Sequence, residues 1–257
     1  MVYRWNVKVP RLTGDETRRA FIYTPTSYRS EPEKRYPVLY MFDGQNVFFD
    51  SDATYGKCWG IKDYLDRTHT DLIVAAVECN RSPENLRLSE YAPFDFDDPE
   101  YGAFTGNGKL TMDWFVHSFK SRIDRNFRTI PDRDHTFISG SSMGGLMSIY
   151  ALTKYNRYFS KAAALSPSLL FNEEPLAALI ARTKFNPNTT LYMDYGSEEF
   201  TYEERMPEIF HRYCGLFMEK NVFLTGRIVP GGTHCEASWE RQVPIFMNTL
   251  MFGMNDN

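Results

Sequence analysis

Residues 137–146 read FISGSSMGGL, and this stretch decides the fold. A short β-branched and aromatic run precedes it, and residues 144–155 after it carry apolar side chains at helical spacing. Gly140, Ser142 and Gly144 therefore form a G-x-S-x-G pattern at a strand-to-helix junction. So sharp a turn crowds the backbone, and the two glycines relieve the crowding. The pattern predicts a nucleophile elbow, with the Ser142 side chain lifted clear of the sheet at a helix N-terminus.

The elbow pattern needs partners, because small residues also allow a helix to pack closely on a sheet. A serine hydroxyl is a poor nucleophile until a base takes its proton. Four of the five histidines lie in predicted helices, in a polar turn or at a strand start: His69, His117, His135 and His211. His234 instead follows VPGGT directly after the last predicted strand. Loops at the carboxyl ends of parallel strands converge, so we expect His234 to be the base for Ser142.

The third member should be a carboxylate that orients the imidazole. The segment LYMDYGSEEF, at the end of the strand before last, supplies Asp194, Glu198 and Glu199. Asp194 is still within the predicted strand, and the residues alone do not choose between Glu198 and Glu199. The chain order serine, acid, histidine is that of α/β hydrolases.

An oxyanion hole requires two backbone N–H groups. One is expected from Met143, directly after the nucleophile. The segment YMFDGQNVFFD follows another buried strand, and its Asp43-Gly44 pair allows a tight turn that directs the Gln45 amide inward. DGQN is also a good ordinary turn, so it supports the site only in combination with the other elements.

The rest of the chain alternates strands and helices, which predicts an α/β fold with a mostly parallel sheet covered by helices on both faces. We expect an antiparallel hairpin from residues 3–10 and 18–25 at the N-terminus. The other expected strands span 36–42, 71–78, 135–139, 161–167, 189–195 and 222–229, and the helices span 55–67, 110–127, 144–155, 174–183, 202–220 and 237–252. A single domain over residues 1–257 is expected, with a long loop without periodicity at about 79–109.

Composition excludes several classes of protein. The net charge is -4, and no Lys/Arg cluster occurs, which argues against a nucleic-acid partner. No apolar run approaches the length of a membrane span, and no leader peptide is visible. Four cysteines are scattered without metal-ligand spacing, which favours reduced thiols in a cytoplasmic protein and no metal.

Five segments together resemble the putative-esterase family of α/β hydrolases, which includes feruloyl and acetyl-xylan esterases, enterochelin-type esterases, S-formylglutathione hydrolase and mycolyltransferases. They are MFDGQNVF, FRTIPDRDHTFISGSSMGGLMSIYAL, FSKAAALSPSL, YGSEE and GGTHCEASWERQVPIFMNTLMF. In this family the acid usually lies three residues after the glycine that ends the penultimate strand, which implies Glu199. The second oxyanion amide usually follows the glycine of DG, which implies Gln45. The N-terminal hairpin and residues 79–109 match the family less closely.

The expected activity is therefore hydrolysis of a carboxylic ester through an acyl-enzyme, without a cofactor. Acetyl or feruloyl-type esters of sugars or similar alcohols are the expected substrates. Acyl transfer to a second alcohol and a catalytically silent carbohydrate-binding module are the alternatives. Candidate substrate contacts are Asp43, Trp59 and the loop aromatics Phe94, Phe96, Tyr101 and Phe104, although such rings equally often hold a loop to the core.

Overall fold

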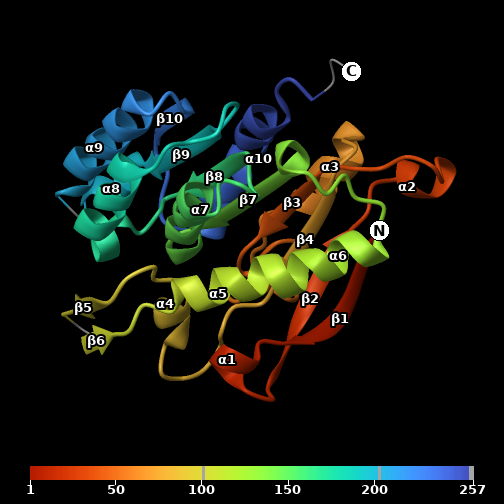
Figure 1. Cartoon of the computed structure of the whole chain (residues 1–257), viewed down its shortest axis with the longest axis horizontal. Coiled ribbons are helices and arrows are strands. Elements are labelled where there is room, and N and C mark those ends of the chain that lie inside the picture. Colours follow the sequence, from red (N-terminus) through yellow and green to blue (C-terminus); the bar gives the residue numbers. More distant parts are fainter. Residues whose placement is uncertain (100–101, 202–203, 255–257) are drawn as a thin grey trace.

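The computed structural model describes residues 1–99, 102–201 and 204–254. Its central sheet has eight strands in the order β1-β2-β4-β3-β7-β8-β9-β10 (Figure 1). The hairpin β1–β2 is antiparallel and joins β4 in antiparallel fashion, and every later neighbour is parallel. The predicted mostly parallel sheet with an N-terminal hairpin is confirmed.

The element bounds follow the expected alternation. The strands are β1 (Val2–Lys8), β2 (Thr17–Tyr23), β3 (Val38–Met41), β4 (Ile73–Val77), β5 (Phe96–Asp98), β6 (Gly102–Phe104), β7 (Thr136–Ser141), β8 (Lys161–Leu165), β9 (Thr190–Gly196) and β10 (Phe223–Val229). The α-helices are α1 (Pro10–Thr13), α2 (Ser27–Ser30), α3 (Ile61–Thr68), α4 (Leu86–Glu90), α5 (Gly108–Trp114), α6 (Ser121–Asn126), α7 (Met143–Lys154), α8 (Glu173–Arg182), α9 (Met206–Glu219) and α10 (Glu236–Met251). Short 3-10 turns are η1 (Gly44–Asn46), η3 (Arg133–His135), η4 (Leu169–Asn172) and η5 (Ser197–Thr201), and a π-helical stretch, η2 (Phe115–Lys120), links α5 to α6.

The sheet is buried on both faces, as its continuous apolar strands predict. In β3, Val38 and Tyr40 belong to the core under α5 to α9, whereas Leu39 and Met41 belong to the core under α3 and α10. Figure 1 shows α5 and α6 crossing one face of the sheet, with α3 and α10 on the other. None of the helices among the described residues is long and apolar enough to cross a membrane.

Two sequence expectations need correction. The helix expected from residue 55 begins only at Ile61, because Gly60 before it adopts a left-handed conformation with φ 62°. Residues 79–109 also have regular structure: they contain α4 and a small hairpin of β5 and β6. Their irregular sequence hid these elements because each is only three to five residues long.

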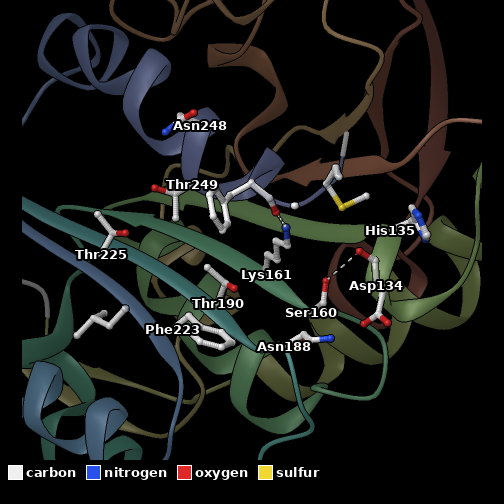
Figure 2. A pocket seen from close by; sticks show the side chains of 14 residues that line it. Asp134, His135, Ser160, Lys161, Asn188, Thr190, Phe223, Thr225, Asn248 and Thr249 are labelled. Carbon is white, nitrogen blue, oxygen red and sulfur yellow. Dashed lines mark hydrogen bonds between the residues drawn. The ribbon is translucent and has the colours of Figure 1, made fainter. Parts of the chain in front are cut away.

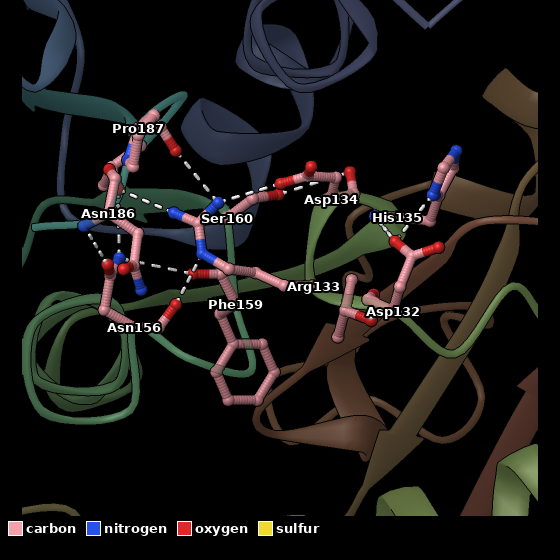
Figure 3. A network of polar contacts seen from close by, with 11 residues as sticks. Asp132, Arg133, Asp134, His135, Asn156, Phe159, Ser160, Asn186 and Pro187 are labelled. Carbon is pink, nitrogen blue, oxygen red and sulfur yellow. Dashed lines mark hydrogen bonds and ion pairs between the residues drawn. The ribbon is translucent and has the colours of Figure 1, made fainter.

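The segment FRTIPDRD before the elbow fixes the start of β7. Arg133 donates to the backbone carbonyls of Asn156 (2.6 Å) and Pro187 (3.0 Å) and to the Thr189 hydroxyl (2.7 Å) (Figure 3). Asp132 accepts from the His135 backbone N–H at 3.1 Å. This network joins the turns that precede β7 and β9, at the sheet edge opposite Ser142.

Candidate active site

The carboxyl ends of the parallel strands bring the predicted residues to one edge of the sheet. A pocket of about 740 Å³ lies there. Its lining comes from the loops after four strands and includes Asp43, Gln45, Cys79, Asn80, Arg81, Arg87, Ser142, His234, Glu236 and Trp239. Chain segments more than 190 residues apart therefore meet at one pocket.

Ser142 sits on a strained turn between β7 and α7. It has φ 56° and ψ −124°, outside the regions that a side-chain-bearing residue normally occupies. A Cβ on Gly140 would lie 2.6 Å from the backbone of Gly144, so Gly140 has to be a glycine. The Ser142 N–H donates to the Leu165 carbonyl at 3.0 Å, and this bond ties the turn to β8.

Glu199 and His234 contact each other directly. A Glu199 carboxylate oxygen lies 2.7 Å from Nδ1 of His234. The other oxygen accepts from the Ser166 hydroxyl (2.6 Å) and the Gly196 N–H (2.8 Å). Burial tends to raise the pKa of Glu199, but the hydrogen bonds from His234, Ser166 and Gly196 outweigh it, and the net pKa is lowered. Glu199 is thus held as a carboxylate against an imidazole that is 46% exposed.

The two other carboxylates of this segment lie elsewhere. Glu198 is exposed, and its backbone N–H donates to the Gly232 carbonyl at 3.0 Å. Asp194 is buried in β9 and accepts from the Tyr192 hydroxyl at 2.6 Å. Burial raises the pKa of Asp194 to about 7, against the opposing effect of that hydrogen bond. Of the three, only Glu199 faces His234.

The loops that carry Glu199 and His234 touch through their backbones. A Cβ on Gly196 would overlap the backbone of Gly232, and a Cβ on Gly232 would lie 2.8 Å from Cα of Gly196. The Trp239 indole packs edge-on against the His234 ring, with ring centroids 5.2 Å apart, and donates to the Ser166 hydroxyl at 2.9 Å. The glycine contact and Trp239 together fix the imidazole from two sides.

The hydroxyl of Ser142 has a different partner from the expected one. Its Oγ lies 3.2 Å from Oγ of Ser168, whose N–H also donates to the Ser142 carbonyl at 3.0 Å. No hydrogen bond joins Ser142 to His234 in the described part of the chain, although both line the pocket. Catalytic hydrogen bonds often form fully only when substrate is bound.

The two expected oxyanion amides are both available. Met143 is the first residue of α7, where N–H groups have no partner within the helix. Gln45 lies in η1, and within residues 1–99, 102–201 and 204–254 no backbone carbonyl accepts its N–H. Its side chain is engaged with Cys79, which donates its backbone N–H to the Gln45 amide oxygen at 3.4 Å.

Asp43 lines the pocket, but both its carboxylate oxygens are engaged. Arg87 donates to them from Nε at 2.7 Å and from a terminal nitrogen at 2.6 Å. Asp43 is buried and has a left-handed backbone with φ 54°. Burial tends to lower the pKa of Arg87, but the neighbouring Asp43 carboxylate outweighs it and the net pKa is raised.

The described aromatic candidates are not among the residues that line this pocket. Phe96 stacks on Phe104 with centroids 5.1 Å apart and contacts Phe171 at 4.9 Å, and Phe94 packs edge-on against Tyr150. Trp59 is buried against Trp239 and Phe246. These rings satisfy one another or the core, and none of them is in the described pocket lining. Tyr101 lies outside the described residues.

Sequence reasoning missed four polar residues around the site: Arg87, Ser166, Ser168 and Glu236. Ser166 and Ser168 lie in LSPSL, where the proximity of that strand end to the elbow was a usable signal. Glu236 is buried, which raises its pKa, and it accepts from the Asn46 side chain at 3.1 Å. Arg87 had no local signal, because its partner is 44 residues away.

Another hollow, of about 790 Å³, lies at the opposite edge of the sheet, where β7 to β10 begin (Figure 2). Its buried amine, Lys161, donates to the carbonyls of Leu250 and Phe252, both at 2.8 Å. Lys161 therefore caps the end of α10. Among the described residues, no group of three or more His, Cys, Asp or Glu side chains could hold a metal ion.

Known proteins resemble this chain in sequence and in fold. Residues 13–246 match the family model described as Putative esterase. The uncharacterized protein YbbA of Bacillus subtilis (strain 168) is 27% identical over 185 residues, 71% of this chain and 69% of YbbA. A solved ferulic acid esterase shares the fold with a TM-score of 0.70 and 17% identity, over 97% of this chain and 96% of that one. An IroE-like serine hydrolase from Shewanella oneidensis gives 0.73 and 19%, over 97% and 78%.

The matched residues run from the last residue of α1 into α10 and contain the elbow, the Asp43-Gly44 turn, Glu199 and His234. The structural likeness shows a common α/β-hydrolase fold. With most of its length covered by the family model, this chain belongs to the putative-esterase family and is an esterase-family hydrolase.

Proposed function

We propose that this protein is a serine carboxylic-ester hydrolase in which Ser142, His234 and Glu199 form the catalytic triad. One observation carries the proposal. The Glu199 carboxylate contacts Nδ1 of His234 at the strand edge where Ser142 occupies its strained turn. A carboxylate in that position fixes the imidazole so that Nε2 is the proton acceptor, and it stabilises the imidazolium that forms.

The proposed reaction has two stages, acylation of Ser142 and hydrolysis of the acyl-enzyme. Nε2 of His234 takes the proton of the Ser142 hydroxyl while Oγ attacks the ester carbonyl carbon. The carbonyl oxygen becomes an oxyanion, which the N–H groups of Gln45 and Met143 stabilise. The imidazolium gives its proton to the leaving alcohol, which leaves an acyl ester on Ser142. Water attacks this ester with His234 again as base, and the acid and free Ser142 are released.

The proposed substrates are acetyl or feruloyl-type esters of sugars or similar alcohols. The pocket lining supports a polar substrate, since Asn80, Arg81 and Glu236 line it and its described aromatic residues are Tyr55 and Trp239. Hydroxyl-rich alcohols find hydrogen-bond partners in such a lining, whereas a long acyl chain would desolvate these groups without replacing their hydrogen bonds. A ferulic acid esterase among proteins of the same fold agrees with this choice.

A cytoplasmic location is part of the proposal. All four cysteines are free, and Cys58 and Cys79 are buried. Free thiols are typical of a reducing compartment. Fractionation of the native organism, with a thiol-labelling assay, would test this.

The test of the activity is direct. Mixing the protein with a p-nitrophenyl acetate excess should give a burst of p-nitrophenol, and mass spectrometry should find the acetyl group on the peptide that contains Ser142. Ser142→Ala should abolish the burst while leaving the melting temperature unchanged within a few degrees. A mutant with wild-type turnover would disprove the mechanism.

A hydrolysis screen of acetylated sugars, feruloyl esters and simple acyl esters then identifies the substrate, and a sugar acceptor added to each assay tests acyl transfer.

A further inference from the structure

We infer that Arg87 is a positioning residue for the oxyanion hole. It acts through Asp43, which it holds by two hydrogen bonds, and thereby fixes the Gln45 amide that would stabilise the tetrahedral intermediate. This inference rests on the proposed function. Arg87 lies in α4, within the segment at 79–109 that follows β4.

The turn that presents Gln45 is strained and needs external support. Asp43 has a left-handed backbone at φ 54° and ψ 52°, which costs energy for a residue with a side chain. A free turn of this kind would relax, and the Gln45 N–H would lose its direction. Such backbone conformations persist where the surroundings fix them.

Three consecutive residues of this turn are each held by β4 or by the chain directly after it. Asp43 accepts two hydrogen bonds from Arg87 and donates its backbone N–H to the Tyr91 hydroxyl at 3.3 Å. Gly44 packs so closely on Val77 that a Cβ would lie 2.8 Å from the Val77 backbone. Gln45 is held through its side chain by Cys79. The turn is therefore clamped along its whole length from one side.

Arg87 makes the strongest of these contacts. A bidentate guanidinium–carboxylate pair fixes orientation as well as distance, since two parallel bonds define a plane. The Asp43 side chain is 8% exposed and that of Arg87 is 27% exposed, so water screens the pair only partly. Arg87 also stacks over the Tyr91 ring at 5.2 Å, which couples the two anchors of Asp43.

The pair also explains why Arg87 does not serve mainly as a substrate contact. Its Nε and one terminal nitrogen are already engaged with Asp43, and the charge is neutralised there. Residues that hold a catalytic dipole in place change the rate of the chemical step more than substrate affinity, because the oxyanion develops only in the transition state.

The experiment compares Arg87→Ala and Arg87→Lys with the wild-type enzyme on p-nitrophenyl acetate. It measures kcat, KM, the burst amplitude and the inhibition constant of a trifluoromethyl ketone, which forms a reversible tetrahedral adduct on the serine. For Arg87→Ala we expect kcat to fall about 10²-fold, because a shift of the order of 1 Å in a catalytic group has that effect. The inhibition constant should rise by a similar factor, with KM unchanged within about two-fold. Arg87→Lys keeps the positive charge but cannot make two parallel hydrogen bonds to Asp43, so its loss of kcat should be intermediate.

A matched control comes from Arg133, an arginine that makes several hydrogen bonds at the opposite edge of the sheet (Figure 3). Arg133→Ala should lower the melting temperature but leave kcat and the inhibition constant unchanged. Asp43→Asn combined with Arg87→Ala should lose no more in kcat than the worse single variant, because both changes break one contact.

The outcomes separate the two proposals. If Ser142→Ala keeps wild-type activity, the proposed function fails and this inference fails with it. If Ser142→Ala is inactive but Arg87→Lys and Arg87→Ala raise KM alone, Arg87 binds substrate and the inference is overturned. A reduced burst amplitude with an unchanged inhibition constant would mean that Arg87 only keeps the protein folded, and it also overturns the inference.

Discussion

The segment at 79–109 consists of two parts that differ in composition and in what they contact. The proximal segment, residues 79–91, supplies Asn80, Arg81 and Arg87 to the pocket and clamps the Asp43 turn. In the distal segment, residues 94–106, Phe96 stacks on Phe104 and contacts Phe171 of η4, and Asn172 of η4 bonds both the N–H and the carbonyl of Phe94 at 3.1 Å. The aromatic residues of the distal segment predict a substrate-binding loop, but its described residues do not line the pocket.

The difference has a simple physical origin. Aromatic rings gain free energy from any apolar neighbour, so a cluster of them satisfies itself without reference to the site. Charged groups have few acceptable partners once they are partly buried. Arg87 therefore has to sit where Asp43 is, and a second buried pair, Arg18 with Glu90, anchors the same short helix α4 to β2.

The largest effect should come from Glu199, which lies in neither segment, and it is the reference for the effects expected within them. Glu199→Gln should lower kcat by roughly 10²–10⁴-fold, since a neutral amide no longer stabilises the imidazolium. Steady-state kinetics on p-nitrophenyl acetate measures it. Glu198→Gln, a change of the exposed neighbour, should have no effect, and a reversal of the two would assign the acid to Glu198.

A smaller effect is expected within the proximal segment. Tyr91→Phe removes the hydroxyl that accepts the Asp43 N–H and leaves the ring in place. One neutral hydrogen bond corresponds to ~0.5–1.5 kcal/mol, so kcat should fall about 2- to 10-fold with KM unchanged. Tyr155→Phe, which removes a hydroxyl bonded to Asp113 away from the pocket, is the control. Equal kcat values for Tyr91→Phe and Tyr155→Phe would show that the contacts of the Asp43 turn do not affect catalysis.

Within the distal segment the expected effect on turnover is close to none. Phe96→Ala removes a ring packed between Phe104 and Phe171 and should lower the free energy of unfolding by about 3 kcal/mol. The ratio of kcat/KM for a feruloyl ester to that for an acetyl ester should stay constant. If KM rose for the feruloyl ester alone, the aromatic rings of the distal segment would be substrate contacts. Both segments would then contribute to the site.

The last effect is on stability rather than on turnover, and it concerns Asp194, a reference site outside both segments. Its folded pKa of about 7 lies above the ordinary value near 3.9, so the folded state keeps a proton that the unfolded chain releases. This stabilisation is complete below about pH 4 and is lost as the pH rises to about 7. In a melting series from pH 4 to 8, Asp194→Asn should therefore gain stability relative to the wild type up to pH 7 and stay level above it. A constant difference across the series would contradict the raised pKa.

Much of the fold could be predicted because its signals are local. Buried parallel strands read as continuous apolar runs, and the elbow needs Gly140 and Gly144 within five residues of each other. The positions of Ser142 and His234 at one edge followed from topology. Choosing Glu199 over Glu198 needed the family's spacing, because both lie on the same short turn.

What could not be predicted depends on contacts between distant segments. Three contacts are of this kind: the Arg87–Asp43 pair, the hydrogen bond from Ser166 to Glu199, and the packing of Phe96 on Phe104. In each of them, the sequence around one residue does not indicate which residue it contacts. Periodicity reports which face of an element is buried, but not which loop it meets. The short elements α4, β5 and β6 could not be predicted for the same reason. Contacts with neighbouring segments stabilise them, and their own sequences show no periodicity.

The backbone contact between Gly196 and Gly232 has a consequence for how this protein can be changed. The loops of Glu199 and His234 are interlocked, so neither can be lengthened, shortened or exchanged for that of a relative without the other. The two loops therefore have to be changed together. The described residues of the distal segment do not line the pocket, so a change there should leave the acid and the base together.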